Sequence, residues 1–286
     1  MSGDFAFLSA RVFNTPLMLT EAKAEIIMAA LAERLGVTQL SRGDGAAVAM
    51  AGYALDSDAA PERPYGITPE GVAIIPIQGT LIQRGALHPY SGMTSYSGIR
   101  CKFLGAMADE DVRGIVLDID SPGGEVAGVF DLADTILAAR GVKPIWAILN
   151  ESAYSAAYCL ASAADTITVP RTGGAGSIGV IAMCVDLSRA LDQQGITVNV
   201  IAHGKRKADG NQFQPLAKEA RDRFQADVDS IGALFEATVA RNRGIAVQAV
   251  RDTEAGTFQG PAAVALKLAD RVAAPDEAFD AFLQRL

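Results

Sequence analysis

Side chains that bind metals or form disulfides are scarce in this chain of 286 residues. It has three cysteines, Cys101, Cys159 and Cys184, and two histidines, His88 and His203. Three cysteines cannot all pair, and their positions lack the spacing of zinc ligands. We therefore expect a protein of a reducing compartment that holds no metal ion and uses no other cofactor.

Basic residues are also in the minority, with 25 Lys and Arg against 33 Asp and Glu and a net charge of −8. Such a chain without basic clusters repels nucleic acids and anionic membranes. No apolar run approaches the ~18 residues of a membrane helix. Residues Met1 to Phe13, which include Asp4 and Arg11, lack the basic start and apolar run of a signal peptide. These absences predict a cytoplasmic protein with no nucleic-acid partner and no membrane partner.

Apolar residues, by contrast, make up 50% of the chain, which is enough for a sizeable core. Apolar runs that end at glycine or polar residues predict buried strands, and apolar residues three and four apart predict helices. The strands are predicted at 72–77, 114–120, 144–149, 167–169 and 197–201, and the helices at 20–35, 126–140, 152–164 and 215–243. This alternation predicts an α/β fold with a largely parallel sheet.

Composition also divides the chain into segments. Residues 41–70 are rich in Gly, Ala and Asp and contain Pro61, Pro64 and Pro69, which is typical of a linker. We expect an N-terminal arm with a helix at 1–40, a linker at 41–70, the main domain at 71–272 and a C-terminal tail at 273–286.

Two glycine-rich segments follow predicted strands. Asp120-Ser-Pro-Gly-Gly124 could turn its N–H groups toward an oxyanion or a phosphate, or could be an ordinary turn between a strand and a helix. The segment from Gly173 to Gly179 contains the spacing G-x-G-x-x-G. No acidic residue follows the next strand to bind a ribose, so this spacing indicates a nucleotide only weakly.

Two further positions could carry nucleophilic chemistry. Ser155 opens a predicted helix of small residues. There it is an exposed nucleophile, a helix cap or part of a packing seam of small residues. Gly204-Lys-Arg-Lys207 is either a solvated basic loop or the source of a lysine base, which can accept a proton only in its neutral form. Neither His88 nor His203 is placed to activate a serine, so a serine hydrolase would need such a lysine.

Taken together and in this order, these segments resemble the signal peptide peptidase A family of serine peptidases. The matching segments are Gly114–Gly124, Ser155–Tyr158, Ala163–Asp165, Gly176–Val180 and Gly204–Lys207. Three further stretches are similar to the phage branch of capsid assembly (prohead) proteases: Asn14–Leu19, Pro89–Tyr96 and Lys207–Asn211. The resemblance implies a Clp protease/crotonase-like fold with stacked, largely parallel sheets, and a Ser-Lys peptidase domain at 71–272.

The resemblance also implies a role for each site residue. Ser155 matches the nucleophile and Lys207 the general base. The N–H groups of Gly124 and Ala156 would form the oxyanion hole, and Ser177 would orient the lysine. Lys205 competes with Lys207 for the role of base, and the motif spacing favours Lys207.

The sequence departs from the family pattern at two places. The usual Ser-Gly-Gly-Tyr is Ser155-Ala156-Ala157-Tyr158 here, and an alanine at 156 would be strained if that position requires a positive φ. Lys267 stands where a glycine is expected to end a helix.

The expected function is therefore a serine endopeptidase that cleaves capsid scaffold or portal proteins and assembles into a homo-oligomeric ring. Two other functions stay open. One is an inactive structural component of the capsid or scaffold, and the other is a crotonase-like enzyme acting on acyl-CoA.

Overall fold

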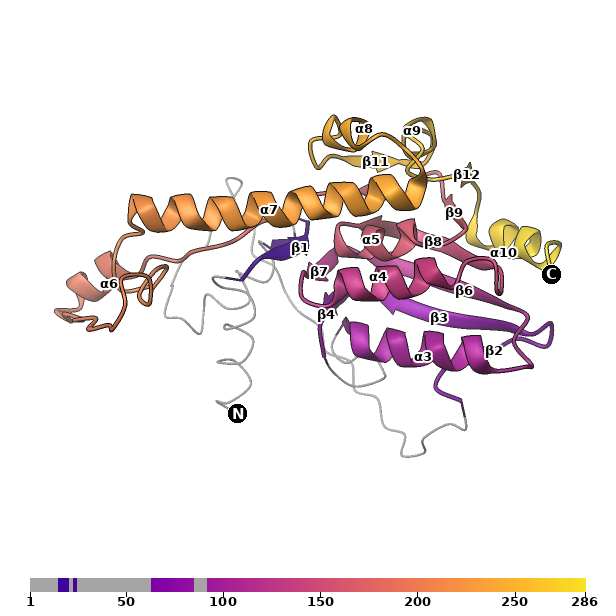
Figure 1. Cartoon of the computed structure of the whole chain (residues 1–286), viewed down its shortest axis with the longest axis horizontal. Coiled ribbons are helices and arrows are strands. Elements are labelled where there is room, and N and C mark those ends of the chain that lie inside the picture. Colours follow the sequence, from indigo (N-terminus) through magenta and orange to yellow (C-terminus); the bar gives the residue numbers. More distant parts are fainter. Residues whose placement is uncertain (1–14, 21–22, 25–62, 85–91) are drawn as a thin grey trace. The chain divides into compact units, whose positions relative to one another are not determined.

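The computed structural model describes residues 15–20, 23–24, 63–84 and 92–286. These residues fall into two units (Figure 1). The larger unit comprises Met18–Gly179 and Phe235–Leu286, and the smaller comprises Val180–Leu234 and the N-terminal segment that ends at Leu17. Most of the predicted arm at 1–40 and linker at 41–70 lies outside the described residues. Within that arm, the Thr20 carbonyl accepts hydrogen bonds from the N–H groups of Lys23 and Ala24, as at the start of a helix.

An eight-stranded sheet forms the centre of the larger unit. Six strands follow the order β11 (Thr257–Gln259), β10 (Gly174–Gly176), β8 (Ile145–Tyr154), β6 (Gly114–Ser121), β3 (Val72–Gln78) and β2 (Gly66–Ile67). Beside β8 lies β9 (Thr166–Val169), which pairs in turn with β12 (Arg271–Val272). All pairs are parallel except those of β2 and β11 at the two ends. The α/β fold with a largely parallel sheet is confirmed.

The central strands are the apolar runs seen in the sequence. Residues 72–77, 114–119 and 145–149 are almost wholly buried, as expected for parallel strands covered on both faces. The register of β6 against β8 shifts between Ile119 and Ser121, and beyond the shift Ser121 pairs with Ala153. This pairing brings the end of β6 beside the end of β8.

A second, four-stranded sheet has the order β1 (Leu17–Leu19), β7 (Gly123–Glu125), β4 (Thr80–Ile82) and β5 (Met93–Ser95). Both β4 and β7 begin directly after long strands of the first sheet, β3 and β6. The glycine-rich segment after β6 is therefore itself a short strand, which pairs in parallel with β4 at Leu81 and Gly124.

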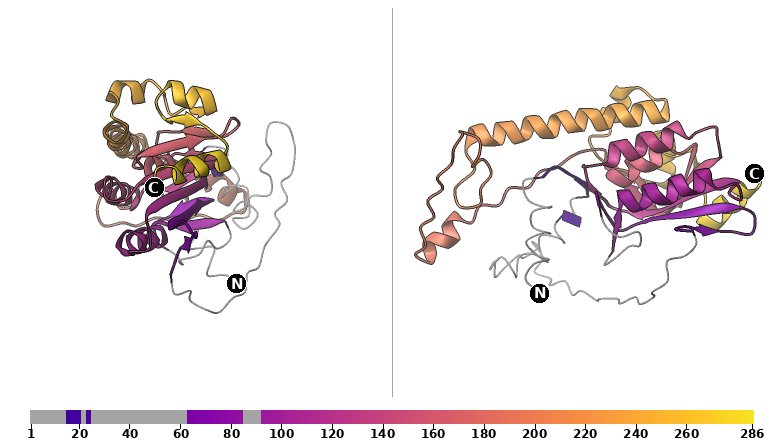
Figure 2. Two further views of the ribbon diagram at one scale, coloured as in Figure 1. Left: turned by 90° about the vertical axis from the view of Figure 1, so that its right-hand side faces the viewer. Right: turned by 60° about the horizontal axis from the view of Figure 1, so that its bottom comes forward.

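Helices cover the large sheet. The helices α3 (Tyr96–Ala108), α4 (Val129–Ala138) and α5 (Ala156–Ser162) lie side by side along it (Figures 1 and 2). After β9 and β10, the chain adds α8 (Val247–Arg251) and α9 (Gly260–Ala265).

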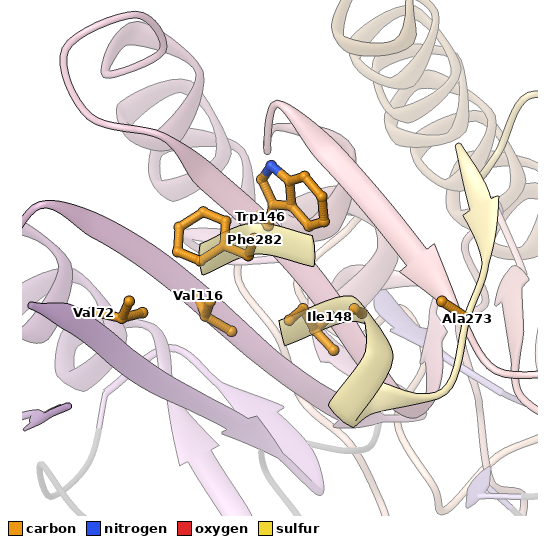
Figure 3. Packing of buried hydrophobic residues seen from close by; sticks show 7 residues of the cluster. Val72, Val116, Trp146, Ile148, Ala273 and Phe282 are labelled. Atoms are coloured by element: carbon orange, nitrogen blue, oxygen red, sulfur yellow. The ribbon is translucent and has the colours of Figure 1, made fainter. Parts of the chain in front are cut away.

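Residues 273–286, expected to be a tail, include helix α10 (Pro275–Leu283). Its Phe282 is fully buried against Trp146, with ring centroids 5.5 Å apart. Val72, Val116 and Ile148 complete this contact (Figure 3). The C-terminal segment thus covers a face of the sheet, because burying its apolar side chains there removes apolar surface from water on both sides of the contact.

The smaller unit has little core of its own. It contains α6 (Ser188–Gln193) and the first part of α7 (Lys218–Arg243), and between Val180 and Leu234 only Gly210 and Ala220 are buried. Helix α7 confirms the helix predicted at 215–243. Phe235 and Val239 on its apolar stripe are buried in the larger unit.

The strand predicted at 197–201 is wrong, because these residues form no strand. An apolar alternating segment becomes a strand only when a neighbouring strand completes its hydrogen bonds. Here no such neighbour lies among the described residues, and Ile201 is 96% exposed.

Of the helices that the structure describes, none combines the length and the apolar character needed to cross a bilayer.

Lys267 confirms the expectation drawn from the family pattern, because it adopts the left-handed backbone of a residue that ends a helix, with φ 60°. It follows α9, and its N–H donates to the Val264 carbonyl over 2.9 Å. A side chain at such a φ is strained, which explains why a glycine is expected there.

Replacing Lys267 by glycine should therefore stabilise the fold by about 1 kcal/mol, because glycine removes the left-handed strain. The free energy of unfolding in urea measures this change. Lys267→Ala is the control, since it removes the exposed side chain but keeps the Cβ, and it should give no gain. Equal gains from both variants would show that the side chain, and not the backbone, is unfavourable.

Candidate active site

Ser155 lies at the turn between β8 and α5 with φ 54° and ψ −120°, a strained conformation for a residue with a side chain. Its backbone N–H and its carbonyl both form hydrogen bonds. Its N–H donates to the Gly176 carbonyl over 2.8 Å, and its carbonyl accepts from the Cys159 N–H over 3.0 Å. The first bond ties the turn to β10 and the second begins α5. In α/β-hydrolases, a similarly sharp turn from a strand to a helix presents the nucleophilic serine.

The hydroxyl of Ser155 forms no hydrogen bond that would stabilise the fold within the described residues. The residue is only 1% exposed, and its Oγ has no hydrogen-bond partner among them. Ser155 is the N-cap residue of α5, but its side chain makes no capping bond, so the alternative role as a helix cap is wrong. Leaving a buried hydroxyl unpaired costs about 1–3 kcal/mol, which marks this one as a candidate for chemistry.

The glycine-rich turn after β6 packs directly against this serine. The Ser121 hydroxyl donates to the Gly79 carbonyl over 2.6 Å and accepts from the Gly123 N–H over 3.2 Å, which holds the turn in place. Gly123 has φ 101°, and a Cβ there would stand 2.9 Å from the Cβ of Ser155 and 2.2 Å from the carbonyl oxygen of Met18. Only a glycine allows this approach.

Gly124 is equally constrained, because a Cβ there would stand 1.9 Å from the Leu81 carbonyl oxygen. On the other side of Ser155, Ala156 is the first residue of α5 and is fully buried. The first N–H groups of a helix have no partner within it. Ala156 has a helical backbone and not a positive φ, so the strain considered for an alanine at this position does not arise.

Ser177 follows Gly176, the residue that accepts the Ser155 N–H. It is half-buried with φ 53°, and its N–H donates to the Gly256 carbonyl over 2.7 Å. The glycines before it serve close strand packing, since a Cβ at Gly174 would stand 2.3 Å from the Tyr154 hydroxyl. These glycines form β10 and no loop that opens a helix, so the structural context of a nucleotide-binding turn is missing.

Lys207 belongs to the smaller unit. It is exposed on the turn at residues 205–210, where its N–H donates to the Gly204 carbonyl over 3.1 Å. The turn is anchored two residues later, where Arg223 Nε of α7 donates to Asp209 over 2.8 Å. Ser155, Gly124, Ala156 and Ser177 are thus gathered in the larger unit, and Lys207 is presented by the smaller one.

Two neighbours of the serine on α5 are not candidates for the chemistry. Burial raises the pKa of the Cys159 thiol, which keeps it in the protonated form that is a poor nucleophile. Burial likewise raises the pKa of Tyr158, whose hydroxyl donates to the Leu268 carbonyl over 2.9 Å. Tyr158 therefore anchors α5 to the chain after α9, a role that the sequence did not reveal.

Sequence reasoning also missed Met18, whose carbonyl lies against the glycine turn, and the bracing role of Ser121. The only available signals were the resemblance in Asn14–Leu19 and the serine within the glycine-rich motif. Within the described residues, no cluster of three or more His, Cys, Asp or Glu side chains could hold a metal ion.

We expect Gly123→Ala to destabilise the fold far more than Gly141→Ala. Both glycines have a positive φ, but a Cβ at Gly141 meets open space and one at Gly123 meets backbone and the side chain of Ser155. The control should lose ~1 kcal/mol from strain alone, and Gly123→Ala should lose about 1–3 kcal/mol more from crowding. Urea unfolding measures the loss of stability in both variants. Equal losses would contradict the close contact of Gly123 with Met18 and Ser155.

Comparison with known proteins agrees with the motifs. Residues 138–285 match the profile of Peptidase family S49. The chain is 40% identical over 280 residues to the head-tail preconnector protein GP5 of Enterobacteria phage P21, covering 95% of this chain and 56% of that protein. It is 40% identical over 274 residues to the capsid assembly protease C of Escherichia phage lambda, covering 93% of this chain and 62% of the relative.

A more distant relative is the putative protease MJ0651 of Methanocaldococcus jannaschii, 28% identical over 171 residues, which cover 59% of this chain and 55% of the relative. The chain thus spans little more than half the length of the phage proteins it matches. The resemblance to the phage branch of the signal peptide peptidase A family is confirmed. With its matched segment covering more than half of its length, the chain belongs to peptidase family S49.

Proposed function

We propose that this chain is a serine endopeptidase of phage capsid assembly, with Ser155 as nucleophile and Lys207 as general base. The observation that carries the proposal is the Ser155 hydroxyl, which is buried on a strained turn beside a glycine strand and has no hydrogen-bond partner among the described residues. Membership of a peptidase family and the names of the two phage relatives support it.

The reaction follows from the residue types. Neutral Lys207 Nζ takes the proton of Ser155 Oγ while that oxygen attacks the scissile carbonyl carbon. The N–H groups of Gly124 and Ala156 bind the oxygen that becomes negative, and loss of one such donor lowers the rate on the order of 10²–10³-fold. Lys207 then protonates the leaving amine, and water, deprotonated by the same lysine, releases the acyl group. The Ser177 hydroxyl orients the lysine.

The proposed substrates are capsid scaffold or portal proteins, because the relatives are named for capsid assembly and head-tail connection. The reaction would then take place in the host cytoplasm, inside the assembling procapsid. No nucleic acid and no membrane take part.

We further propose that the chain works as a homo-oligomeric ring, with Ser155 and Lys207 meeting at or near an interface between subunits. The smaller unit supports this proposal, because its apolar side chains are poorly buried within the chain: Ile196, Ile201 and Leu234 are 46%, 96% and 50% exposed. Burial of these side chains against a second copy of the chain would contribute to the stability of such an assembly.

Alanine variants test the catalytic residues in digests of casein or scaffold protein, followed by gels and intact mass. Ser155→Ala should abolish cleavage, Lys207→Ala should lower the rate on the order of 10²–10⁴-fold, and Ser177→Ala should only weaken it. Lys205→Ala is the matched control on the same turn and should cleave normally.

If Ser177→Ala alone abolishes cleavage, the nucleophile has been assigned to the wrong motif. If the assembled wild-type protein cleaves nothing and binds no boronic acid directed at a nucleophilic serine, the chain is instead a structural component of the capsid.

Mixing two inactive variants tests the interface. In a ring where each serine uses the neighbour's lysine, co-expressed Ser155→Ala and Lys207→Ala chains should recover about a quarter of the activity, because random assembly pairs two intact residues at that frequency. Light scattering gives the mass of the active species. No recovery on mixing would place the dyad within one chain, and a fully active monomer would exclude the ring.

A further inference from the structure

The N-terminal strand β1 lies against the proposed active site. It is the last strand of the four-stranded sheet and pairs with β7, the strand that contains Gly123 and Gly124 (Figure 1). Leu17 also exchanges two hydrogen bonds of 2.8 and 3.0 Å with Ile181. The Thr20 N–H donates to the Pro122 carbonyl over 3.0 Å. A Cβ at Gly123 would meet both the Met18 carbonyl oxygen and the Ser155 Cβ, at 2.2 and 2.9 Å. One glycine therefore has β1 against it on one side and the nucleophile on another.

This strand is firmly held, and the serine beside it is closed off. The side chains of Leu17, Met18 and Leu19 are 2%, 0% and 5% exposed. Ser155 is 1% exposed, and its Oγ has neither solvent contact nor a hydrogen-bond partner among the described residues. A hydroxyl in this state cannot meet the carbonyl carbon of a polypeptide until something nearby moves.

The edge of β7 is suited to an extended polypeptide. A strand edge offers its N–H and C=O groups at the spacing of another strand, so it binds a peptide backbone regardless of sequence. The other edge of β7 is taken by β4. The edge covered by β1 is thus the one that a polypeptide could use to reach Ser155 along β7.

We propose that β1 occupies the edge of β7 along which the substrate would bind, here called the binding strip. In this position β1 acts as a latch that keeps the peptidase inactive until the strand is displaced. The ligand of this strip is an extended polypeptide segment with Leu- or Met-sized apolar side chains, because such a segment replaces the contacts of Leu17–Leu19. The inference rests on the proposed function, since it concerns access to Ser155. A peptidase whose substrates surround it during assembly gains from such latency.

A charge within β1 tests the latch. Met18→Asp places a carboxylate in a fully buried position and should weaken docking of the strand. The initial rate of casein cleavage should rise at least about tenfold, which corresponds to ~1.4 kcal/mol of docking free energy. Leu283→Asp, on α10 at a half-buried position, is the control for general loosening of the fold and should give no rise. A folded Met18→Asp protein that is no faster than wild type, or a rise shared with Leu283→Asp, overturns the latch.

Hydrogen exchange on the wild-type protein gives a second test that does not depend on the variant folding. A tripeptide boronic acid with Leu side chains forms a reversible adduct with a nucleophilic serine and extends along the binding strip. When it binds, the amides of residues 17–20 should lose protection because β1 is displaced. Unchanged or increased protection would show that β1 is a wall of the site and stays in place.

Ser155→Ala separates the two proposals. If casein cleavage and boronate binding both survive in this variant, the nucleophile assignment fails and the latch fails with it. If both are lost in Ser155→Ala but β1 keeps its protection in the wild-type adduct, the peptidase assignment stands and only the latch is wrong.

Discussion

Ser155 keeps a left-handed backbone because neighbours hold both of its peptide groups. The bond from its N–H to Gly176 fixes the turn to β10, and the bond from Cys159 to its carbonyl starts α5. Such a conformation costs free energy by itself and persists because the surrounding structure holds it. The position of the hydroxyl, the start of α5 and the place of Ser177 one residue after Gly176 all depend on this constraint.

The close packing of the backbone around Ser155 explains where glycine is required and where it is not. Gly123 and Gly124 face backbone atoms on neighbouring strands so closely that no Cβ fits. Ala156 and Ala157 lie in the first turn of α5 with no such conflict, fully buried in its packing. Alanine is favoured over glycine in a helix by ~1 kcal/mol, so the departure from Ser-Gly-Gly-Tyr stabilises α5.

The proposed site residues are divided between the two units. The larger one holds Ser155, the glycine strand β7 and the start of α5, all built on a well-buried parallel sheet. The smaller one carries the lysine on an exposed turn held by Asp209 and Arg223. In the proposed mechanism, a rigid nucleophile and a separately carried base are compatible with an enzyme whose activity depends on assembly, and the proposed displacement of β1 would add a second control at the same place.

Local sequence determined much of this protein. The apolar runs predicted the main strands, the spacing from Phe224 to Val239 predicted α7, and the order of the motifs indicated the family and its site residues. Those features depend on burial and on contacts between near neighbours in the chain, which leave a pattern in the sequence. The short strands β4 and β7, the role of α10 and the absence of a strand at 197–201 depend on partners far away in the chain. Only the tertiary structure decided that Met18 lies against Gly123, because these residues are more than a hundred positions apart and their contact leaves no periodic trace. It also decided that the Ser155 hydroxyl has no hydrogen-bond partner among the described residues, because that depends on how the surrounding elements pack.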